Sequence, residues 1–219
     1  MGNDYTFIDI EEHSIITHIN NEELFNRDSI IVDCGACIGD FTYPLLEKYG
    51  CKFVLWEPDI RNYRKLRKRF KKHHNVEIFN GAIDVDDGKK TLYFGAYKTS
   101  SSLYGSHRGL TDMKTTINTR SLNKELQSLI VDKPITLVKI DIEGTEKEVI
   151  PSLIPEVLEW IDQINIEFHL QSEIKDYSTD DVDKCRNHLL NNGFNEILYN
   201  PNHGTNKGQD ALYINNRLI

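Results

Sequence analysis

Five short apolar segments of this sequence each run directly into glycine or into a polar side chain. The segments lie at residues 30–34, 51–56, 76–79, 135–140 and 164–169. Their length and β-branched content predict buried strands. The residues at their ends are Asp33 with the glycines after it, Glu57, Asn80-Gly81, Asp141, and Glu167 with His169. If these strands are parallel, all of these groups meet at one edge of one sheet.

Two amphipathic helices are expected between the first three strands. One begins near Asp40 and ends at Gly50, and the other is capped by Asp59. Their apolar faces are Phe41, Leu45, Leu46 and Tyr49 in the first, and Tyr63, Leu66 and Phe70 in the second. Strands that alternate with helices indicate an α/β fold, with a mainly parallel sheet and helices on both faces.

The remaining segments complete a single domain over residues 1–219. A helix is expected at about 180–190, followed by two strands that form an antiparallel hairpin with a long loop. Residues 84–120 change to short alternating pieces broken by Gly, Ser and Lys, which indicates an irregular insert with a few strands. Residues 1–28 are expected to be an N-terminal extension. A chain of this length is most simply one large domain.

Composition excludes several classes of protein. The formal net charge of −8 disfavours a surface that coats nucleic acid, because an acidic field repels phosphate. Four cysteines in 219 residues are too sparse for a disulfide scaffold. The sequence has neither a run long enough to span a bilayer nor a start typical of a secretion signal. We therefore expect a cytoplasmic protein without a membrane span, and no pattern indicates its oligomeric state.

The segment VDCGACIGDF after the first strand admits two interpretations. Cys34 and Cys37 have the spacing of a metal or redox site, but no second pair lies at a matching distance. We therefore interpret both as small buried side chains. Gly35 and Gly39 favour a turn that brings the backbone close to a cofactor, or that only shapes the passage from strand to helix.

Charge and spacing narrow the choice of cofactor. Glu57 lies 18 residues after Gly39, at the end of the second strand, where nucleoside cofactors place their ribose hydroxyls. The glycine segment lacks the Gly-x-Gly-x-x-Gly pattern of nicotinamide-binding folds. Asp33 at its start suits a ligand with a cationic group better than a diphosphate. S-adenosylmethionine is such a ligand.

Five motifs together resemble the FkbM-type family of class I S-adenosylmethionine-dependent methyltransferases. They are VDCGACIGDF, WEPD, NGAI, SSSL and KIDIEGTE, in this order, and they cover about residues 28–170. KIDIEGTE is the most specific of them. The resemblance implies a seven-stranded Rossmann-like sheet with an antiparallel C-terminal hairpin. It also implies methyl transfer to an oxygen, often the hydroxyl of a sugar or natural product.

The resemblance also implies a cofactor site. The methionine part would be lined by Asp33, Gly35, Ala36, Ile38 and Gly39. The ribose would be held by Glu57, which Pro58 follows, and the adenine would be bordered by Gly81 and Ala82. Ser101 and Ser102 match a serine pair near the cofactor. The two cysteines of the first motif are not part of the family pattern.

A hydroxyl acceptor benefits from a base that takes its proton as the methyl group arrives. The candidates are Asp141, Glu143, Glu167 and His169. Asp141 follows the central strand and is the first choice as a site residue, either as the base or as a partner of the cofactor amine. His169 suits the role of a general base better, because the ordinary pKa of histidine lies closer to neutral pH than that of a carboxylate. A Mg²⁺ ion held by Asp141, Glu143 and His169 is a further hypothesis that the residue types allow without specifying it.

The helix after Asp59 carries eight Lys and Arg between residues 61 and 72. We interpret these cations as a solvent-exposed face of the helix, because packing of its apolar stripe is enough to explain why the helix forms. The expected acceptor is thus a small molecule or glycan. Two alternatives stay open: methylation of RNA or another polyanion through this helix, and a module that binds an adenosine cofactor without catalysis.

Overall fold

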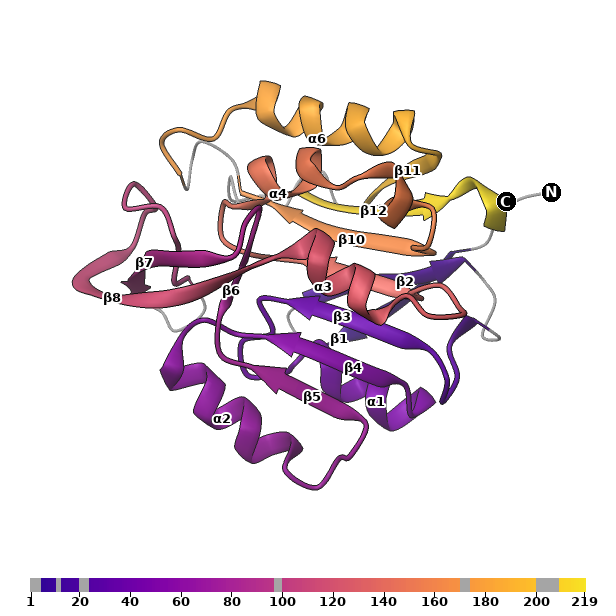
Figure 1. Cartoon of the computed structure of the whole chain (residues 1–219), viewed down its shortest axis with the longest axis horizontal. Helices are drawn as coiled ribbons and strands as arrows, with labels where there is room; N and C mark the ends of the chain where they lie inside the picture. The colour runs from indigo at the N-terminus through magenta and orange to yellow at the C-terminus, as the bar shows by residue number, and fades with distance from the viewer. Residues whose placement is uncertain (1–4, 11–12, 20–23, 97–99, 170–173, 200–208) are drawn as a thin grey trace.

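Seven strands form one sheet in the order β11–β12–β10–β9–β3–β4–β5 (Figure 1). The computed structural model describes residues 5–10, 13–19, 24–96, 100–169, 174–199 and 209–219. The strands are β3 (Ile30–Cys34), β4 (Lys52–Trp56), β5 (Val76–Phe79), β9 (Leu137–Ile140), β10 (Gln163–Phe168), β11 (Phe194–Tyr199) and β12 (Gln209–Asn215). Only β12 pairs antiparallel with both of its neighbours. The predicted mainly parallel sheet with an antiparallel C-terminal hairpin is therefore confirmed.

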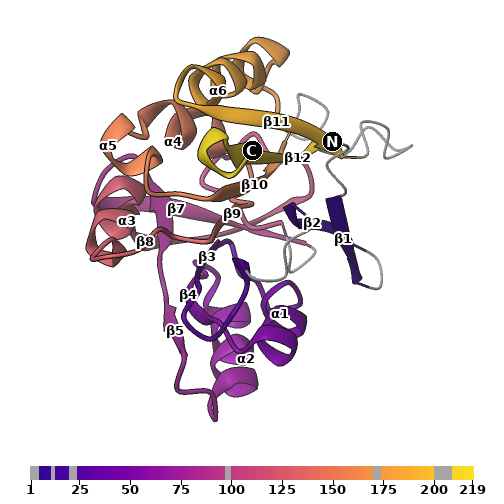
Figure 2. The ribbon, with the colours of Figure 1, turned by 90° about the vertical axis from the view of Figure 1, so that its right-hand side faces the viewer.

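Helices cover both faces of this sheet, as Figure 2 shows. On one face lie α1 (Thr42–Tyr49) and α2 (Ile60–Phe70), and on the other lie α3 (Leu122–Leu129), α4 (Glu146–Ser152), α5 (Pro155–Leu158) and α6 (Thr179–Asn191). Each face has its own hydrophobic cluster. Leu45 and Leu66 belong to the first cluster, and Val149 and Leu189 to the second. The sheet is thus a middle layer that is buried on both sides.

Local chemistry sets the helix ends that the sequence predicted. Gly50 takes the left-handed conformation at φ 69° and donates its N–H to the Leu46 carbonyl, which ends α1. The Asp59 carboxylate accepts the Arg61 N–H and caps α2. α6 begins with a reciprocal capping box between Ser178 and Asp181. All three helices lie where the sequence pattern put them.

The helices α3, α4 and α5 were not indicated by the sequence pattern. They are only eight, seven and four residues long, and α4 contains Pro151. Helices this short are marginal in isolation and depend on tertiary packing. Leu126, Val149 and Val157, one from each helix, are fully buried against the sheet. Packing, not local propensity, therefore forms this side of the molecule.

The segment 84–120 is more regular than the sequence pattern indicated. It contributes β7 (Gly88–Gly95) and β8 (Leu110–Ser121), which pair antiparallel, and β8 also pairs with β6 (Ala82–Asp84). This three-stranded sheet extends beyond the ends to which the arrows of β3, β4 and β5 point (Figure 1). It therefore borders the edge where the polar strand ends were expected to meet.

The N-terminal extension contains a hairpin of β1 (Tyr5–Ile10) and β2 (His13–Ile19), which the sequence pattern did not indicate. β2 lies against β10 and β12. The short helix η2 (Asn216–Leu218) is the last element. In the part of the chain that the structure describes, every helix is too short or too polar to cross a membrane.

Candidate functional site

The ends of three parallel strands are joined at one edge of the sheet. The N–H groups of Gly35 and Ala36 both donate to the Trp56 carbonyl at the end of β4, at 2.9 and 3.0 Å. The Asp141 N–H donates to the Cys34 carbonyl at 3.0 Å. The strand order changes direction between β3 and β9, and ligands of open α/β sheets bind at such a point. The predicted site residues are therefore gathered around the end of β3.

The two glycines of the first motif are required by close packing. Gly35 has φ +88°, and a Cβ atom there would lie 1.8 Å from the Asp141 carbonyl oxygen. Gly39 has φ +85°, and its Cβ would lie 2.4 Å from the Phe70 ring. Gly35 thus lets the loop after β9 approach β3, and Gly39 lets α2 pack on the turn. The expected contact of both with a cofactor stays a prediction.

The cysteines of this motif differ from each other. Cys34 is fully buried, as expected, but Cys37 is only partly buried and has φ +51°, which is uncommon for a residue with a side chain. Burial raises the pKa of the Cys37 thiol to about 12. Both are free thiols. A thiol that holds its proton so firmly is a poor nucleophile.

Glu57 lies at the end of β4, turned toward the glycine turn. Its carboxylate accepts the N–H groups of Cys37 and Asp59, both at 2.7 Å. The side chain is buried, and this burial raises the pKa of Glu57 to about 8. A buried carboxylate that joins the loops after β3 and β4 is well placed to accept ribose hydroxyls.

Asp33 has one unsatisfied oxygen. Its Oδ2 accepts the Thr42 hydroxyl at 2.8 Å, while its Oδ1 has no hydrogen-bond partner among the described residues. The residue is fully buried, and burial is the main cause that raises its pKa. A buried acceptor without a donor is rare and calls for an explanation. The ammonium group of S-adenosylmethionine is a donor of the required charge, so this residue fits that cofactor.

Lys139 is a site residue that the sequence reading missed. Its Nζ lies 2.8 Å from Asp141 Oδ2 and 3.8 Å from Asp33 Oδ1. Burial alone would lower the pKa of Lys139, but Asp141 and Asp33 outweigh it and hold the pKa above its ordinary value. A lysine inside an apolar strand was the available signal, because a buried charge needs charged partners. The positive charge of Lys139 therefore compensates the negative charge of two predicted site residues, Asp33 and Asp141.

His169 lies among carboxylates at the end of β10. Its Nδ1 is 3.1 Å from Glu146 Oε1, and its Nε2 is 3.3 Å from Glu143 Oε2 and 3.9 Å from Asp141 Oδ1. Burial would lower the pKa of His169, but Glu146 and Glu143 outweigh it, and the pKa lies well above the ordinary value. The raised pKa favours the protonated imidazolium form of His169. Its surroundings argue against the expected role as a base.

His107 joins this cluster from the insert, and no sequence pattern singled it out. Its Nε2 lies 2.9 Å from Glu143 Oε2. Its Nδ1 lies 2.6 Å from the Arg108 carbonyl oxygen, which only accepts, so Nδ1 donates there, and Nε2 donates to Glu143 in the imidazolium form, in which both nitrogens carry a hydrogen. Glu143 has φ +53°, and burial raises its pKa while His169 and His107 lower it. Glu143 is thus held by two imidazoles.

Glu146 supports the same loop from the start of α4. Its two carboxylate oxygens accept the N–H groups of Ile142 and Gly144, each at 2.8 Å. It is fully buried and also contacts His169. Sequence reasoning missed this residue, although an acidic side chain at a helix start is an ordinary capping signal. Glu146 fixes the loop that carries Asp141 and Glu143.

The serine pair connects the insert to both sides of the edge. The Ser101 hydroxyl donates to Asp59 Oδ2 at 2.9 Å, and the Ser102 hydroxyl donates to the Glu143 carbonyl at 2.6 Å. Burial would raise the pKa of Asp59, but hydrogen bonds from Arg61 and Ser101 outweigh it, so the pKa is lowered. The predicted serines therefore tie the loop after β4 to the loop after β9.

The residues expected beside the adenine lie at the end of β5. A Cβ atom on Gly81 would lie 3.1 Å from the Asn118 carbonyl and 3.2 Å from the Trp56 ring. Ala82 is buried at the start of β6, whereas Ile38 and Pro58 are partly exposed at the same edge. The structure thus brings these positions near the other predicted cofactor residues without testing their contact with a ligand.

Three ligand atoms at the edge are close enough to hold a metal ion. They come from Asp141, Glu167 and His169 and lie within 4.8 Å of one another. The predicted set had Glu143 where this geometry has Glu167. Repulsion by Asp141, together with burial, raises the pKa of Glu167 to about 8. Lys139 and His169 place positive charge within the same cluster, which opposes a cation there.

A family model matches more than half of the chain. Residues 33–196 match the family described as the methyltransferase FkbM domain. "Methyltransferase 1" of Beauveria bassiana (strain ARSEF 2860) is 25% identical over 163 residues. That match covers 65% of this chain and 66% of the relative, slightly less than two thirds of its length.

Solved structures show the same fold. An rRNA methylase from Streptococcus thermophilus has a TM-score of 0.52 at 14% identity, and the match covers 88% of this chain and 90% of that chain. Fibrillarin of Aeropyrum pernix, solved with natively bound S-adenosyl-L-methionine, has a TM-score of 0.52 at 9% identity, covering 87% and 68%. Together with the family match, these observations show that the chain belongs to the FkbM family of S-adenosylmethionine-dependent methyltransferases.

Proposed function

We propose that this methyltransferase transfers the methyl group to a hydroxyl oxygen of a sugar, a glycan or another small molecule. The observation that carries the proposal is the position of Glu143. Its carboxylate is partly exposed at the site edge and is held by His107 and His169. Its raised pKa suits a group that takes a proton from a hydroxyl near neutral pH.

The other carboxylates suit the cofactor. S-adenosylmethionine supplies an electrophilic methyl group on a positively charged sulfur. Asp33 Oδ1, which accepts no hydrogen bond from the described residues and lies 3.8 Å from Lys139 Nζ, would accept from its ammonium group, and Glu57 would accept from its ribose hydroxyls. Asp141, at the end of the central strand, adds negative charge beside the cationic part. These roles divide the edge into a cofactor side along β3 and β4 and an acceptor side along β9 and β10.

Glu143 is a better candidate base than Asp141 or His169. Lys139 donates to Asp141 and neutralises part of its charge. The carboxylates around His169 raise its pKa and favour the protonated form, which cannot accept a further proton. Glu143 has the raised pKa and the partial exposure that a base needs to reach a bound hydroxyl. We therefore assign proton removal to Glu143 and alignment of the cofactor to Asp141.

The experiment compares Glu143→Gln with Asp141→Asn. Calorimetry with S-adenosylhomocysteine measures cofactor binding, and a panel of glycan and small-molecule alcohols measures methyl transfer. We expect Glu143→Gln to lower kcat by about 10²-fold or more and to change cofactor affinity by less than about threefold. We expect Asp141→Asn to weaken cofactor binding. Full activity of Glu143→Gln at every pH would show that Glu143 is not the base.

The proposal does not include a divalent cation. A cation at Asp141, Glu167 and His169 would lower the pKa of an acceptor hydroxyl, which is the chemistry that such a site offers. It would have to displace Lys139 from Asp141 and remove the proton from His169. Two positive side chains already balance these carboxylates. We therefore expect the transfer to proceed without a metal ion.

RNA as the acceptor is the weaker candidate. The solved rRNA methylase acts on RNA by its printed name, but at 14% identity it shows the fold alone. The exposed cations Arg67 and Lys71 lie beside β5, and β5 is three strands away from β9, which the candidate base follows. Neighbouring strands lie about 4.8 Å apart, so an acceptor on α2 is roughly 14 Å from the catalytic edge. A small hydroxyl compound that binds in the site itself does not have to bridge this distance.

A further inference from the structure

The basic face of α2 carries positive charge that the protein does not balance. Arg61 pairs with Asp59, and Arg69 pairs with Asp40. Within the part of the chain that the structure describes, the other six cations form no ion pair with a carboxylate. They are exposed, and they are Arg64, Lys65, Arg67, Lys68, Lys71 and Lys72. On a chain of net charge −8, such a face attracts anionic partners.

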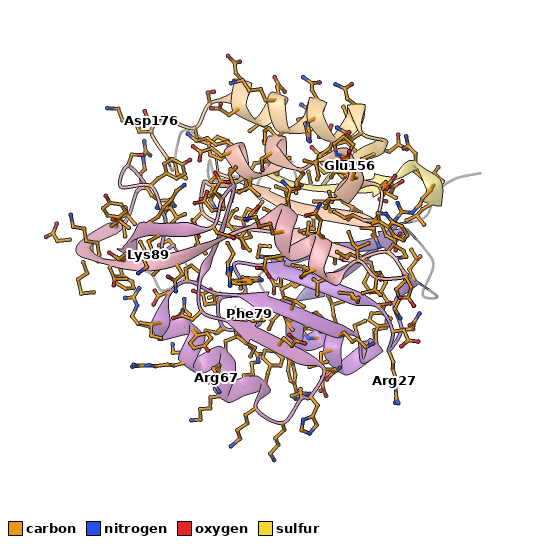
Figure 3. The ribbon with its side chains drawn as sticks, in the orientation of Figure 1. Arg27, Arg67, Phe79, Lys89, Glu156 and Asp176 are labelled. Atoms are coloured by element: carbon orange, nitrogen blue, oxygen red, sulfur yellow. The ribbon has the colours of Figure 1, made fainter. Side chains whose placement is uncertain are left out.

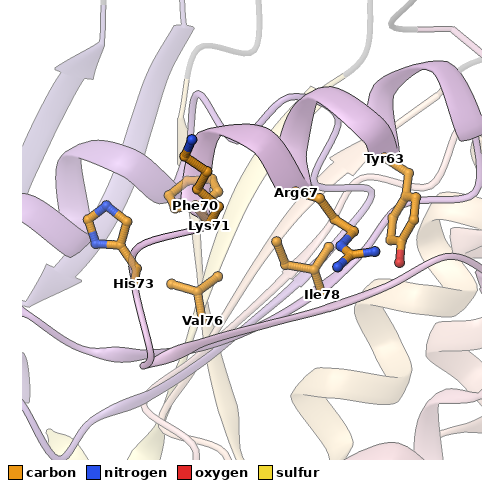
Figure 4. Close-up of a pocket in the computed structure, with 7 residues that line it drawn as sticks. All are labelled: Tyr63, Arg67, Phe70, Lys71, His73, Val76 and Ile78. Atoms are coloured by element: carbon orange, nitrogen blue, oxygen red, sulfur yellow. The ribbon is translucent and has the colours of Figure 1, made fainter.

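A groove lies between this face and strand β5 (Figure 4). It is lined by Tyr63, Arg67, Phe70, Lys71, His73, Val76 and Ile78. Apolar side chains of the helix and the strand contribute to the lining, but most of the accessible lining is polar, and Arg67 and Lys71 add positive charge. Figure 3 shows Arg67 on the outer side of α2. Tyr63, expected in the core, is only partly buried because it faces this groove.

The other wall of the groove is the edge strand β5, whose main-chain N–H and C=O groups can pair with another strand. Phe53 donates its N–H to the Asn75 carbonyl, and Glu57 donates to the Phe79 carbonyl. Alternate residues of a parallel strand point their main-chain groups to opposite sides. Val76 and Ile78 therefore turn their N–H and C=O groups outward. Among the described strands, β5 is paired only with β4.

The spacing of the cations matches an extended peptide. Arg67 lies on α2 and Lys71 is its C-cap residue in helical conformation, so the four positions between them separate the two by about 6 Å along the helix axis. A β-strand presents alternate side chains on one face at intervals of about 7 Å. Acidic residues at every second position of a strand paired with β5 would therefore meet successive cations of α2.

We propose that the groove between α2 and β5 binds an extended acidic segment of a partner protein, which adds a strand to β5. Single-stranded RNA fits less well, because nucleic-acid binding of this kind needs open aromatic faces. Phe70 is 2% exposed, and the Arg67 guanidinium lies over the Tyr63 ring at 5.9 Å. The outward main chain of Val76 and Ile78 is a feature that a peptide uses and RNA does not.

The groove is separate from the catalytic edge. β5 is the edge strand on one side of the sheet, and Glu143 follows β9, three strands away. The occupant is therefore a partner rather than a small acceptor, and the inference does not depend on the identity of the acceptor. The same cations would repel a second β5 edge of this protein with its own basic helix, which protects the edge from self-pairing.

Fluorescence anisotropy with a labelled, end-blocked peptide of alternating Glu and Thr tests the charge part of the proposal. The groove variant is Arg67→Glu with Lys71→Glu. The control is Lys89→Glu with Lys114→Glu, two exposed lysines of β7 and β8 that give the same change of net charge. We expect at least about tenfold weaker binding for the groove variant, less than about threefold for the control, and weaker binding at high salt. Equal loss in both variants would overturn the proposal.

Hydrogen–deuterium exchange tests the strand part. The amides of Val76 and Ile78 should gain protection when the peptide binds, and the change Ile78→Pro should abolish binding while all cations remain. Proline is tolerated where an edge strand turns its N–H outward, and a melting curve checks the fold. Tighter binding of oligo-uridylate or of anionic vesicles than of the peptide, without protection of these amides, would overturn the proposal.

Discussion

The His107 imidazole lies 2.9 Å from the Glu143 carboxylate, although 36 positions of the chain separate the two residues. His107 belongs to the insert, and Glu143 belongs to the loop after β9. Ser102, also in the insert, donates to the Glu143 carbonyl. The insert thus holds both the side chain and the backbone of the candidate base.

Removal of His107 should change the pH dependence of catalysis. Its hydrogen bond lowers the pKa of Glu143, so His107→Ala should raise that pKa and move the acidic limb of the kcat profile to higher pH. We expect kcat at neutral pH to fall about tenfold, with cofactor affinity unchanged. Ser106→Ala, one residue away, is the control. An unshifted acidic limb would show that His107 has only a structural role.

Gly35→Ala should destabilise the protein strongly. The added Cβ would lie 1.8 Å from the Asp141 carbonyl oxygen, in a backbone conformation at φ +88°. The conformation costs about 1–2 kcal/mol and the overpacking about 1–3 kcal/mol, so we expect a loss of about 2–5 kcal/mol in unfolding free energy.

Gly109→Ala separates these two causes. Gly109 has φ +77°, and nothing lies within 4 Å of its added Cβ. It should therefore lose only about 1–2 kcal/mol when both variants are unfolded in a urea titration. Equal losses for the two variants would mean that the close approach of β9 to Gly35 is unimportant.

The stability of the ligand-free protein should fall as the pH rises. Burial raises the pKa of Glu57 from 4.5 to about 8, so the folded state binds this proton more tightly than the unfolded state. Its stabilising contribution is complete below the unfolded pKa and is lost as the pH rises through about 8. Glu167, with its pKa also near 8, acts in the same direction. We expect Tm to decrease between about pH 5 and pH 8.

Glu57→Gln should flatten this decrease, because it removes one of the two carboxyls. Glu77→Gln, which changes an exposed glutamate of β5, should leave the slope of Tm against pH unchanged. Differential scanning calorimetry over this pH range measures the effect. A slope that is the same in Glu57→Gln and in the unaltered protein would contradict the assignment.

Chelation should leave methyl transfer intact. Lys139 and His169 already place positive charge among Asp141, Glu143 and Glu167, so we expect full activity after dialysis against EDTA. The measurement is the rate before dialysis, after it, and after addition of Mg²⁺. Activity that is lost on chelation and restored by Mg²⁺, but not restored in Glu167→Gln, would establish the metal site instead.

The strands and the first two helices were predictable because their signals are local. The apolar run before Asp33, the cap at Asp59 and the glycine at the end of α1 depend only on neighbouring residues. The hairpin β1–β2 and the helices α3–α5 were missed, because pairing and packing with distant elements decide whether such short segments form.

The sequence by itself determined where most strands of the main sheet lie along the chain, the polar groups at their ends and the motifs of the family. These depend on local periodicity and on residue identity, which are present in the chain before it folds. Only the tertiary structure decided that Lys139 balances Asp33 and Asp141, that carboxylates raise the pKa of His169, and that His107 contacts Glu143. The physical reason is that a charge state depends on burial and on distances of a few ångströms, and residues far apart in the sequence set both.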